Sequence, residues 1–237
     1  MATLANRRLI LGILTFAVGW ATFVWGTLNC LSGASADFFL GVETRLLRFE
    51  AFSPAAAREM LADAAGQELS DCDDHSQRAL LLLEIPLAEA ALRSGTARNY
   101  DRHMQSLEAR ARRTLACSPR DSFAWLIAFG LSVQHGSLSE HAFDLLAMSY
   151  ETSPNEAWVA IRRAMVAAPV ALVAPEPVQR EILAEFQNFV SHRFVEMPAH
   201  LYLNAPAPLQ TLLRLRINDV DPTSQKAFSE ALQKLRP

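Results

Sequence analysis

The chain has 237 residues, a formal net charge of −3 and 51% hydrophobic residues. A chain this close to neutrality, with acidic residues in slight excess, lacks the basic surface that nucleic-acid binding requires, so we expect no nucleic-acid partner. Its length is sufficient for one domain with a core of its own.

The N-terminus predicts a membrane anchor. Residues 9–28 carry no charge, and as a helix they extend ~30 Å, about the thickness of the hydrocarbon core of a bilayer. Arg7 and Arg8 precede this run, whereas no charge follows it until Asp37, which favours a cytoplasmic N-terminus. The predicted organisation is a cytoplasmic tail (1–8), a transmembrane anchor (9–28), a juxtamembrane segment (29–52) and a domain across the membrane (53–237).

Cleavage is the alternative to an uncleaved anchor. Ala34-Ser35-Ala36 fits a signal-peptidase site, although the apolar run is longer than an ordinary signal-peptide core. Leu28-Asn29-Cys30 is a poor lipoprotein site, because Asn29 is large and polar just before the cysteine. An uncleaved anchor remains the main prediction.

Three glycines in the anchor, Gly12, Gly19 and Gly26, recur every seven residues. This spacing is close to two helical turns, so the three lie on one face. Small residues on one face let a second membrane helix approach closely. The alternative is that they reflect only the general frequency of glycine in membrane helices.

Cys72 and Cys117 are expected to form a disulfide. Cys72 precedes a predicted helix at 76–93, Ser94-Gly95 breaks the chain, and a second predicted helix at 97–116 leads to Cys117. Two antiparallel helices of similar length bring these cysteines to the same end, and the compartment across the membrane permits oxidation. A pair of buried free thiols is the alternative.

Helix starts are predicted where a capping residue precedes proline. This occurs at Ser53-Pro54, Ser118-Pro119, Ser153-Pro154 and Asp221-Pro222. The second and third pairs are 35 positions apart, and Gly136-Ser137 divides the interval into predicted helices at 120–134 and 138–151.

This 35-residue unit resembles a tetratricopeptide repeat, which is a helical hairpin of about 34 residues. The residues that carry the resemblance are Trp125, Ala128, Gly136, Ala142, Phe143 and Pro154. It covers residues 85–168, and Pro86 departs from the pattern. The predicted fold class is all-α, with an N-terminal transmembrane helix followed by a tetratricopeptide-like stack of helical hairpins; an irregular helical bundle is the alternative.

The sequence contains no catalytic or metal-binding motif that we recognise, so we predict no catalytic residue, cofactor or metal. The acidic residues before His75 lack the spacing of a calcium loop and fit the N-terminus of a helix. Trp158, Arg162 and Arg163 form a possible partner surface, because tryptophan and arginine are favourable anchors at interfaces. The alternative is that the tryptophan fills the core and the arginines are solvated.

The layout also resembles a group of bacterial single-pass membrane proteins with a tetratricopeptide-like periplasmic domain, associated with exopolysaccharide or O-antigen assembly. The carrying residues are the uncharged anchor, Cys117-Ser118-Pro119 with 123–126, and 153–158 with Arg162-Arg163. The resemblance implies an inner-membrane protein whose bulk is periplasmic, and a non-catalytic scaffold for a protein partner in surface-polysaccharide synthesis or export. Alternatives are a periplasmic enzyme or small-ligand-binding protein with a helical pocket, and a subunit that associates through its anchor.

Overall fold

The computed structural model describes residues 16–27, 39, 42, 45, 52–66, 72–136 and 138–236. The elements within these ranges are helices, which confirms the all-α class. From residue 54 onward they are α3 (Pro54–Ala65), α4 (Asp74–Arg93), α5 (Ala97–Cys117), α6 (Ser122–Gln134), α7 (Glu140–Thr152), α8 (Ala157–Ala167), the 3₁₀ turn η1 (Ala168–Val170), α9 (Glu176–Ser191), α10 (Glu196–Asn204), α11 (Ala207–Asn218) and α12 (Pro222–Leu235).

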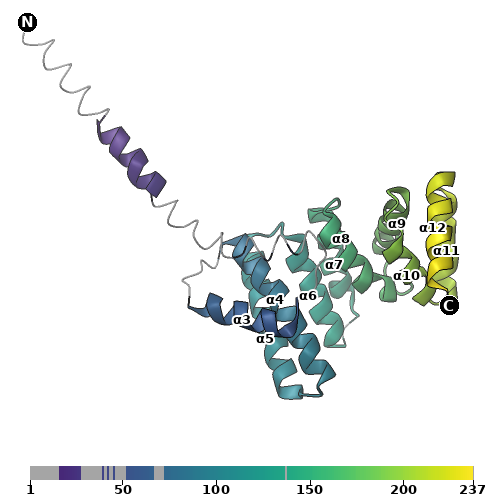
Figure 1. Ribbon diagram of the computed structural model, residues 1–237, viewed down its shortest axis with the longest axis horizontal. Coiled ribbons are helices and arrows are strands. Elements are labelled where there is room, and N and C mark those ends of the chain that lie inside the picture. The colour runs from purple at the N-terminus through teal and green to yellow at the C-terminus, as the bar shows by residue number, and fades with distance from the viewer. Residues whose placement is uncertain are drawn as a thin grey trace, which may run out of the picture.

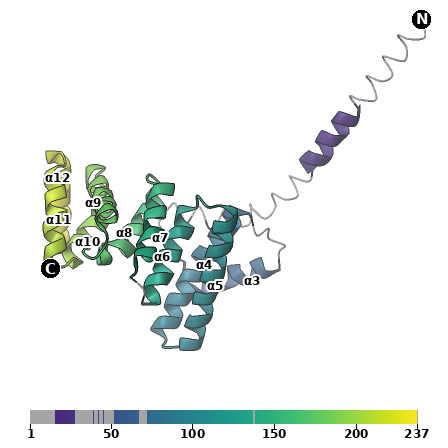
Figure 2. The same ribbon diagram turned by 180° about the vertical axis from the view of Figure 1, so that it is seen from behind.

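The helices stack in chain order from α3 to α12 (Figures 1 and 2). α4 and α5 form an antiparallel hairpin, α6 and α7 form a second one, and α5 packs against α6. α8 contacts both α6 and α9, and α9 also packs against α11 and α12. Helix α8 therefore lies between the two hairpins and the C-terminal helices.

A large apolar core runs through this stack. Leu81 of α4, Phe123 of α6, Leu146 of α7 and Phe186 of α9 are buried members of the same cluster. Phe39 and Val42 also belong to it, so the core includes residues that precede the predicted domain start at 53.

Two of the four predicted helix starts are confirmed. Ser53 caps α3 by accepting a hydrogen bond from the Ala56 amide, with Pro54 as the first helical residue. Asp221 caps α12 by accepting from the amides of Thr223 and Ser224, both at 3.0 Å.

The other two predicted starts are wrong by about three residues. Ser118 and Ser153 are the C-caps of α5 and α7, and the helices that follow begin after Asp121 and Glu156. Asp121 provides the side-chain cap of α6, accepting from the Ala124 amide at 2.8 Å, whereas α8 has no side-chain cap bond. The physical reason is that proline cannot continue a preceding helix, so each Ser-Pro pair here ends one.

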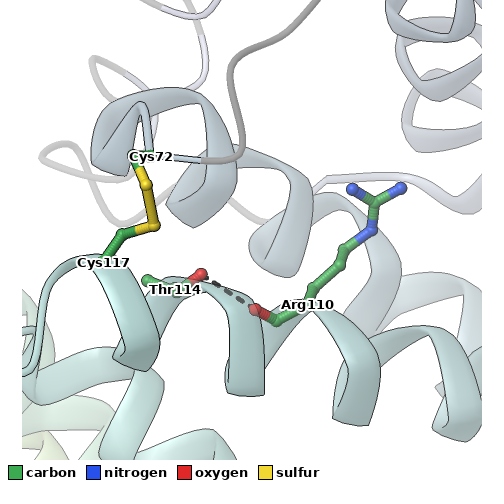
Figure 3. Close-up of a disulfide and its surroundings, with 4 residues drawn as sticks. All are labelled: Cys72, Arg110, Thr114 and Cys117. Carbon is green, nitrogen blue, oxygen red and sulfur yellow. Dashed lines mark hydrogen bonds between the residues drawn. A yellow bond between two sulfur atoms is a disulfide. The ribbon is translucent and has the colours of Figure 1, made fainter.

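The structure joins Cys72 and Cys117 in a disulfide, with Cα atoms 5.1 Å apart, as the sequence predicts. The bond links the residue two before α4 to the last residue of α5 (Figure 3). One turn before Cys117, the Thr114 hydroxyl donates to the Arg110 carbonyl oxygen at 3.0 Å, and the Arg110 side chain extends away from the disulfide. The α4–α5 hairpin is thus closed covalently at one end.

The predicted anchor lies partly outside the described residues. Residues 16–27 are helical and exposed (purple in Figure 1), and no helix in the described part of the chain is long and apolar enough to cross a membrane. Gly19 and Gly26 lie in this helix, and a Cβ added at either would meet no atom within 4 Å. Gly12, Arg7, Arg8 and the possible cleavage site at Ala36 lie outside the described residues.

Candidate interaction site on helix α8

Helix α8 has one face that is partly exposed and one that is buried. The partly exposed face presents, at helical spacing, Trp158, Ile161, Arg162 and Met165. The opposite face is buried and consists of Val159, Ala160, Arg163, Ala164 and Ala167. Adjacent residues on a helix point about 100° apart, so Arg162 and Arg163 have different surroundings.

Arg163 is fully buried, with an exposure of 0%. Its Nε and Nη2 both donate to Oε1 of Glu185 on α9, the first at 3.0 Å. Its Nη1 donates to the carbonyl oxygens of Ser149 at 2.6 Å and Ser153 at 3.4 Å, near the end of α7. The predicted role of Arg163 in a partner surface is therefore wrong: its guanidinium fastens α8 to α7 and α9.

Tyr150 completes this buried charge cluster. The Arg163 guanidinium lies 4.1 Å from the Tyr150 ring centroid, and the Tyr150 hydroxyl donates to Glu185 Oε2 at 3.4 Å. Burial raises the pKa of Glu185 to about 7, and the attraction of Arg163 offsets part of that rise. Burial, followed by the nearby Glu185 charge, raises the pKa of Tyr150 well above its ordinary value.

Trp158 joins the core to the surface. Its ring is tilted against Phe123 of α6, with centroids 5.1 Å apart. Two guanidinium carbons lie near its ring centroid, Arg78 Cζ of α4 at 5.9 Å and Arg162 Cζ at 5.6 Å. Each such cation–π contact contributes roughly 0.5–1 kcal/mol at exposed sites.

The two arginines beside Trp158 differ in charge pairing. Arg78 Nε and Nη2 donate to Asp121 Oδ2 at 3.0 and 2.9 Å, so the α6 cap also neutralises Arg78. Arg162 Nη1 donates to the Trp158 carbonyl oxygen at 3.3 Å, and within the described part of the chain no carboxylate pairs with it. Burial alone lowers the pKa of Arg162.

Trp125 is half-buried and makes a hydrogen bond within the domain. Its indole Nε1 donates to the Pro119 carbonyl oxygen at 2.8 Å, across the turn between α5 and α6. The indole nitrogen is thereby engaged within the domain.

Within the described ranges, the other polar clusters act as helix caps and ion pairs. Among the described residues no group of three or more histidine, cysteine, aspartate or glutamate side chains is placed to hold an ion. Asp73 caps α4 by accepting from the Ser76 amide and hydroxyl, in line with the predicted role of the acidic segment. Glu84 pairs with His103 at 2.7 Å between α4 and α5.

An open hollow of about 400 Å³ lies between α10 and α12. Its ionisable lining side chains are Glu196, His200, Glu230 and Lys234. If the protein were an enzyme or a small-ligand-binding protein, this hollow would be a candidate for its helical pocket.

Comparison with protein-family models, curated proteins and solved structures finds no match. The residues that sequence reasoning missed are Arg78, Asp121 and Glu185. Each of these residues lies on a different helix or cap from its partner, so no local spacing in the sequence connects the two. The one local signal was the position of Asp121 directly before α6, where a carboxylate can cap a helix.

Proposed function

We propose that this protein is a membrane-tethered, non-catalytic adaptor whose helical domain holds a protein partner in a cell-envelope assembly. The observation that carries the proposal is the exposure of apolar side chains in the 16–27 helix, where Phe16 is 69% and Trp25 is 73% exposed. Apolar area costs about 25 cal/mol per Å² in water, so an apolar surface this exposed favours contact with lipid or with another apolar surface.

The flanking sequence supports a membrane as that cover. With residues 9–15 and 28 included, the uncharged run reaches the length of a bilayer span. The basic residues Arg7 and Arg8 favour a cytoplasmic N-terminus and a domain on the opposite side of the membrane.

The order of helix contacts supports an adaptor built like a tetratricopeptide array. α4 and α5, then α6 and α7, are successive hairpins, and the first helices of these units meet in sequence, α4 against α6 and α6 against α8. Stacked hairpins of this kind create extended surfaces that suit protein partners. The resemblance noted in the sequence suggests surface-polysaccharide synthesis or export as the setting.

Co-purification tests the proposal. The full chain with a C-terminal tag is extracted from membranes in mild detergent, and the retained proteins are identified by mass spectrometry against an untagged control. Reproducible recovery of envelope assembly proteins at constant stoichiometry is the expected result. A chain that is recovered alone, or that never enters the membrane fraction, contradicts it.

A glycine variant separates association through the anchor from association through the domain. Replacing Gly12, Gly19 and Gly26 by leucine fills the predicted close-approach face. Loss of the same partners identifies the anchor as the element that binds them, whereas retention assigns binding to the helical domain.

A further inference from the structure

We propose that the partly exposed face of α8 binds an acidic peptide segment of the partner protein, with a peptide carboxylate on Arg162 and an aliphatic side chain against Ile161 and Met165. This inference rests on the proposed adaptor function and names the chemistry of its partner.

Among the described residues, carboxylates pair with two of the three arginines that lie on α8 or against its Trp158, and Arg162 is the one without such a pair. Arg78 has Asp121 and Arg163 has Glu185, both at hydrogen-bond distance. Arg162 is half-buried, and its hydrogen bond to the Trp158 carbonyl oxygen uses one of the five donors that a guanidinium carries. A carboxylate is the complement that matches the remaining planar donors, because it accepts two parallel N–H bonds.

The surroundings of Arg162 are apolar on one side. Met165, one turn further along α8, is 59% exposed. Ile161 belongs to a small cluster with Met197 and Leu201 of α10, and these three side chains are only partly buried. An acidic peptide with an aliphatic residue near its carboxylate would therefore cover both the charge and the apolar surface.

The contacts of Trp158 favour a peptide over a sugar at this face. A sugar ring needs a free aromatic face on which to stack. The Trp158 ring already contacts Phe123, Arg78 and Arg162, so its role here is to orient the Arg162 guanidinium.

The binding face is also held rigidly. Arg163, the next residue, is fixed by hydrogen bonds to α7 and α9, so α8 is fastened to its neighbours from beneath. Preorganised side chains lose less conformational entropy when a ligand binds.

A peptide array tests this proposal with the full chain in detergent. The probes are capped heptapeptides in which leucine alternates with glutamate or aspartate, each with a matched peptide carrying glutamine or asparagine. We expect the wild-type chain to bind the acidic peptides, and Arg162→Gln to weaken that binding at least tenfold. Arg180→Gln removes an exposed arginine of α9 and is expected to bind like the wild type.

A second variant keeps the test independent of any folding defect in Arg162→Gln. Met165→Glu places a like charge on an exposed position and is expected to abolish binding of the acidic peptides while leaving the urea midpoint of the domain unchanged.

The proposal is overturned by equal binding of acidic and amide peptides, by an unchanged affinity in Arg162→Gln, or by a lack of binding to any peptide of the array. Binding of a trigalacturonate probe instead of the peptides, lost in Arg162→Gln, also overturns it and assigns the site to acidic sugars. Because the purified chain is used alone, failure here is distinct from failure of co-purification.

Discussion

Arg163 and Glu185 show what a single pair of side chains contributes to this fold. Arg163 reaches Glu185 on α9 and the carbonyl oxygens of Ser149 and Ser153 near the end of α7. Removing one partner of such a buried pair leaves an uncompensated charge and unpaired polar atoms, which costs more than the pair contributes when intact.

Arg163→Met is therefore expected to lower the free energy of unfolding by about 3–5 kcal/mol, measured by urea denaturation at pH 8. The double variant Arg163→Met/Glu185→Leu is expected to recover part of this loss, because both charges are then absent. Arg180→Met breaks an exposed pair with Glu176 and serves as the control, with a change of roughly 0.5 kcal/mol or less. Equal effects of the two single variants would contradict the burial of Arg163.

Glu185 also predicts a pH dependence. Its pKa in the folded protein is about 7, above the ordinary value of 4.5, so between these pH values the folded state holds a proton that the unfolded chain has lost. The stability contributed by Glu185 is then fully present below pH 4.5 and falls as the pH rises to about 7, by on the order of 3 kcal/mol.

The measurement is the difference in unfolding free energy between the wild type and Glu185→Gln across pH 4.5 to 8. Taking this difference removes the contribution of the other titrating groups. We expect the wild type to lose stability relative to Glu185→Gln as the pH rises. A difference that does not change with pH would refute the raised pKa of Glu185.

At the scale of elements, the start of α6 separates two interpretations of the Ser118-Pro119-Arg120-Asp121 segment. Asp121 both caps α6 through the Ala124 amide and pairs with Arg78 of α4. Ser118 instead ends α5, donating its amide hydrogen to the Thr114 carbonyl oxygen.

Asp121→Ala is expected to destabilise the domain by about 2–3 kcal/mol, since it removes a cap worth ~1 kcal/mol and a largely buried ion pair. Ser118→Ala is expected to change stability by roughly 0.5 kcal/mol or less. Thermal unfolding followed by circular dichroism compares them, with Asp121→Asn retaining the cap and losing the charge. A larger effect at Ser118 would restore the original interpretation of a Ser118 cap.

The disulfide belongs to the α4–α5 hairpin as an element. It closes a loop with a sequence separation of 45 residues, so in the chain-entropy model it stabilises the fold by about 4 kcal/mol. We expect the double variant Cys72→Ser/Cys117→Ser to lose about this much in urea denaturation.

Non-reducing peptide mass spectrometry of the wild type provides the covalent evidence, and one linked peptide pair containing Cys72 and Cys117 is expected. Two separately alkylated thiols would show that the hairpin closes without oxidation.

At the scale of the whole molecule, the apolar N-terminal helix and the packed domain have separable roles. We expect deletion of residues 1–28 to move the protein from the membrane to the soluble fraction after lysis. The urea midpoint of the domain is expected to stay the same, because the buried residues Phe39 and Val42 remain. A truncated chain that still sediments with membranes would place the membrane contact elsewhere.

Local sequence patterns were enough to predict the helical class, the bounds of α4 to α7 to within two residues, and the cysteine pairing. These depend on short-range chemistry: Gly95 and Gly136 adopt positive φ between helices, prolines and small polar residues mark boundaries, and two similar helices must return Cys117 to Cys72. Even the misplaced starts near Ser118 and Ser153 follow from local chemistry, because Ser-Pro suits the end of one helix and the approach to the next.

Which polar side chains are buried together depends on how the helices pack, and no local pattern shows it. Arg162 and Arg163 are chemically identical neighbours, and their different fates depend on where α7 and α9 pack against α8. Glu185 lies 22 residues from Arg163, and Asp121 lies 43 residues from Arg78. Local sequence patterns do not reveal pairs that lie this far apart in the chain. These contacts form only when whole helices pack together, and the charges that become buried must then be paired.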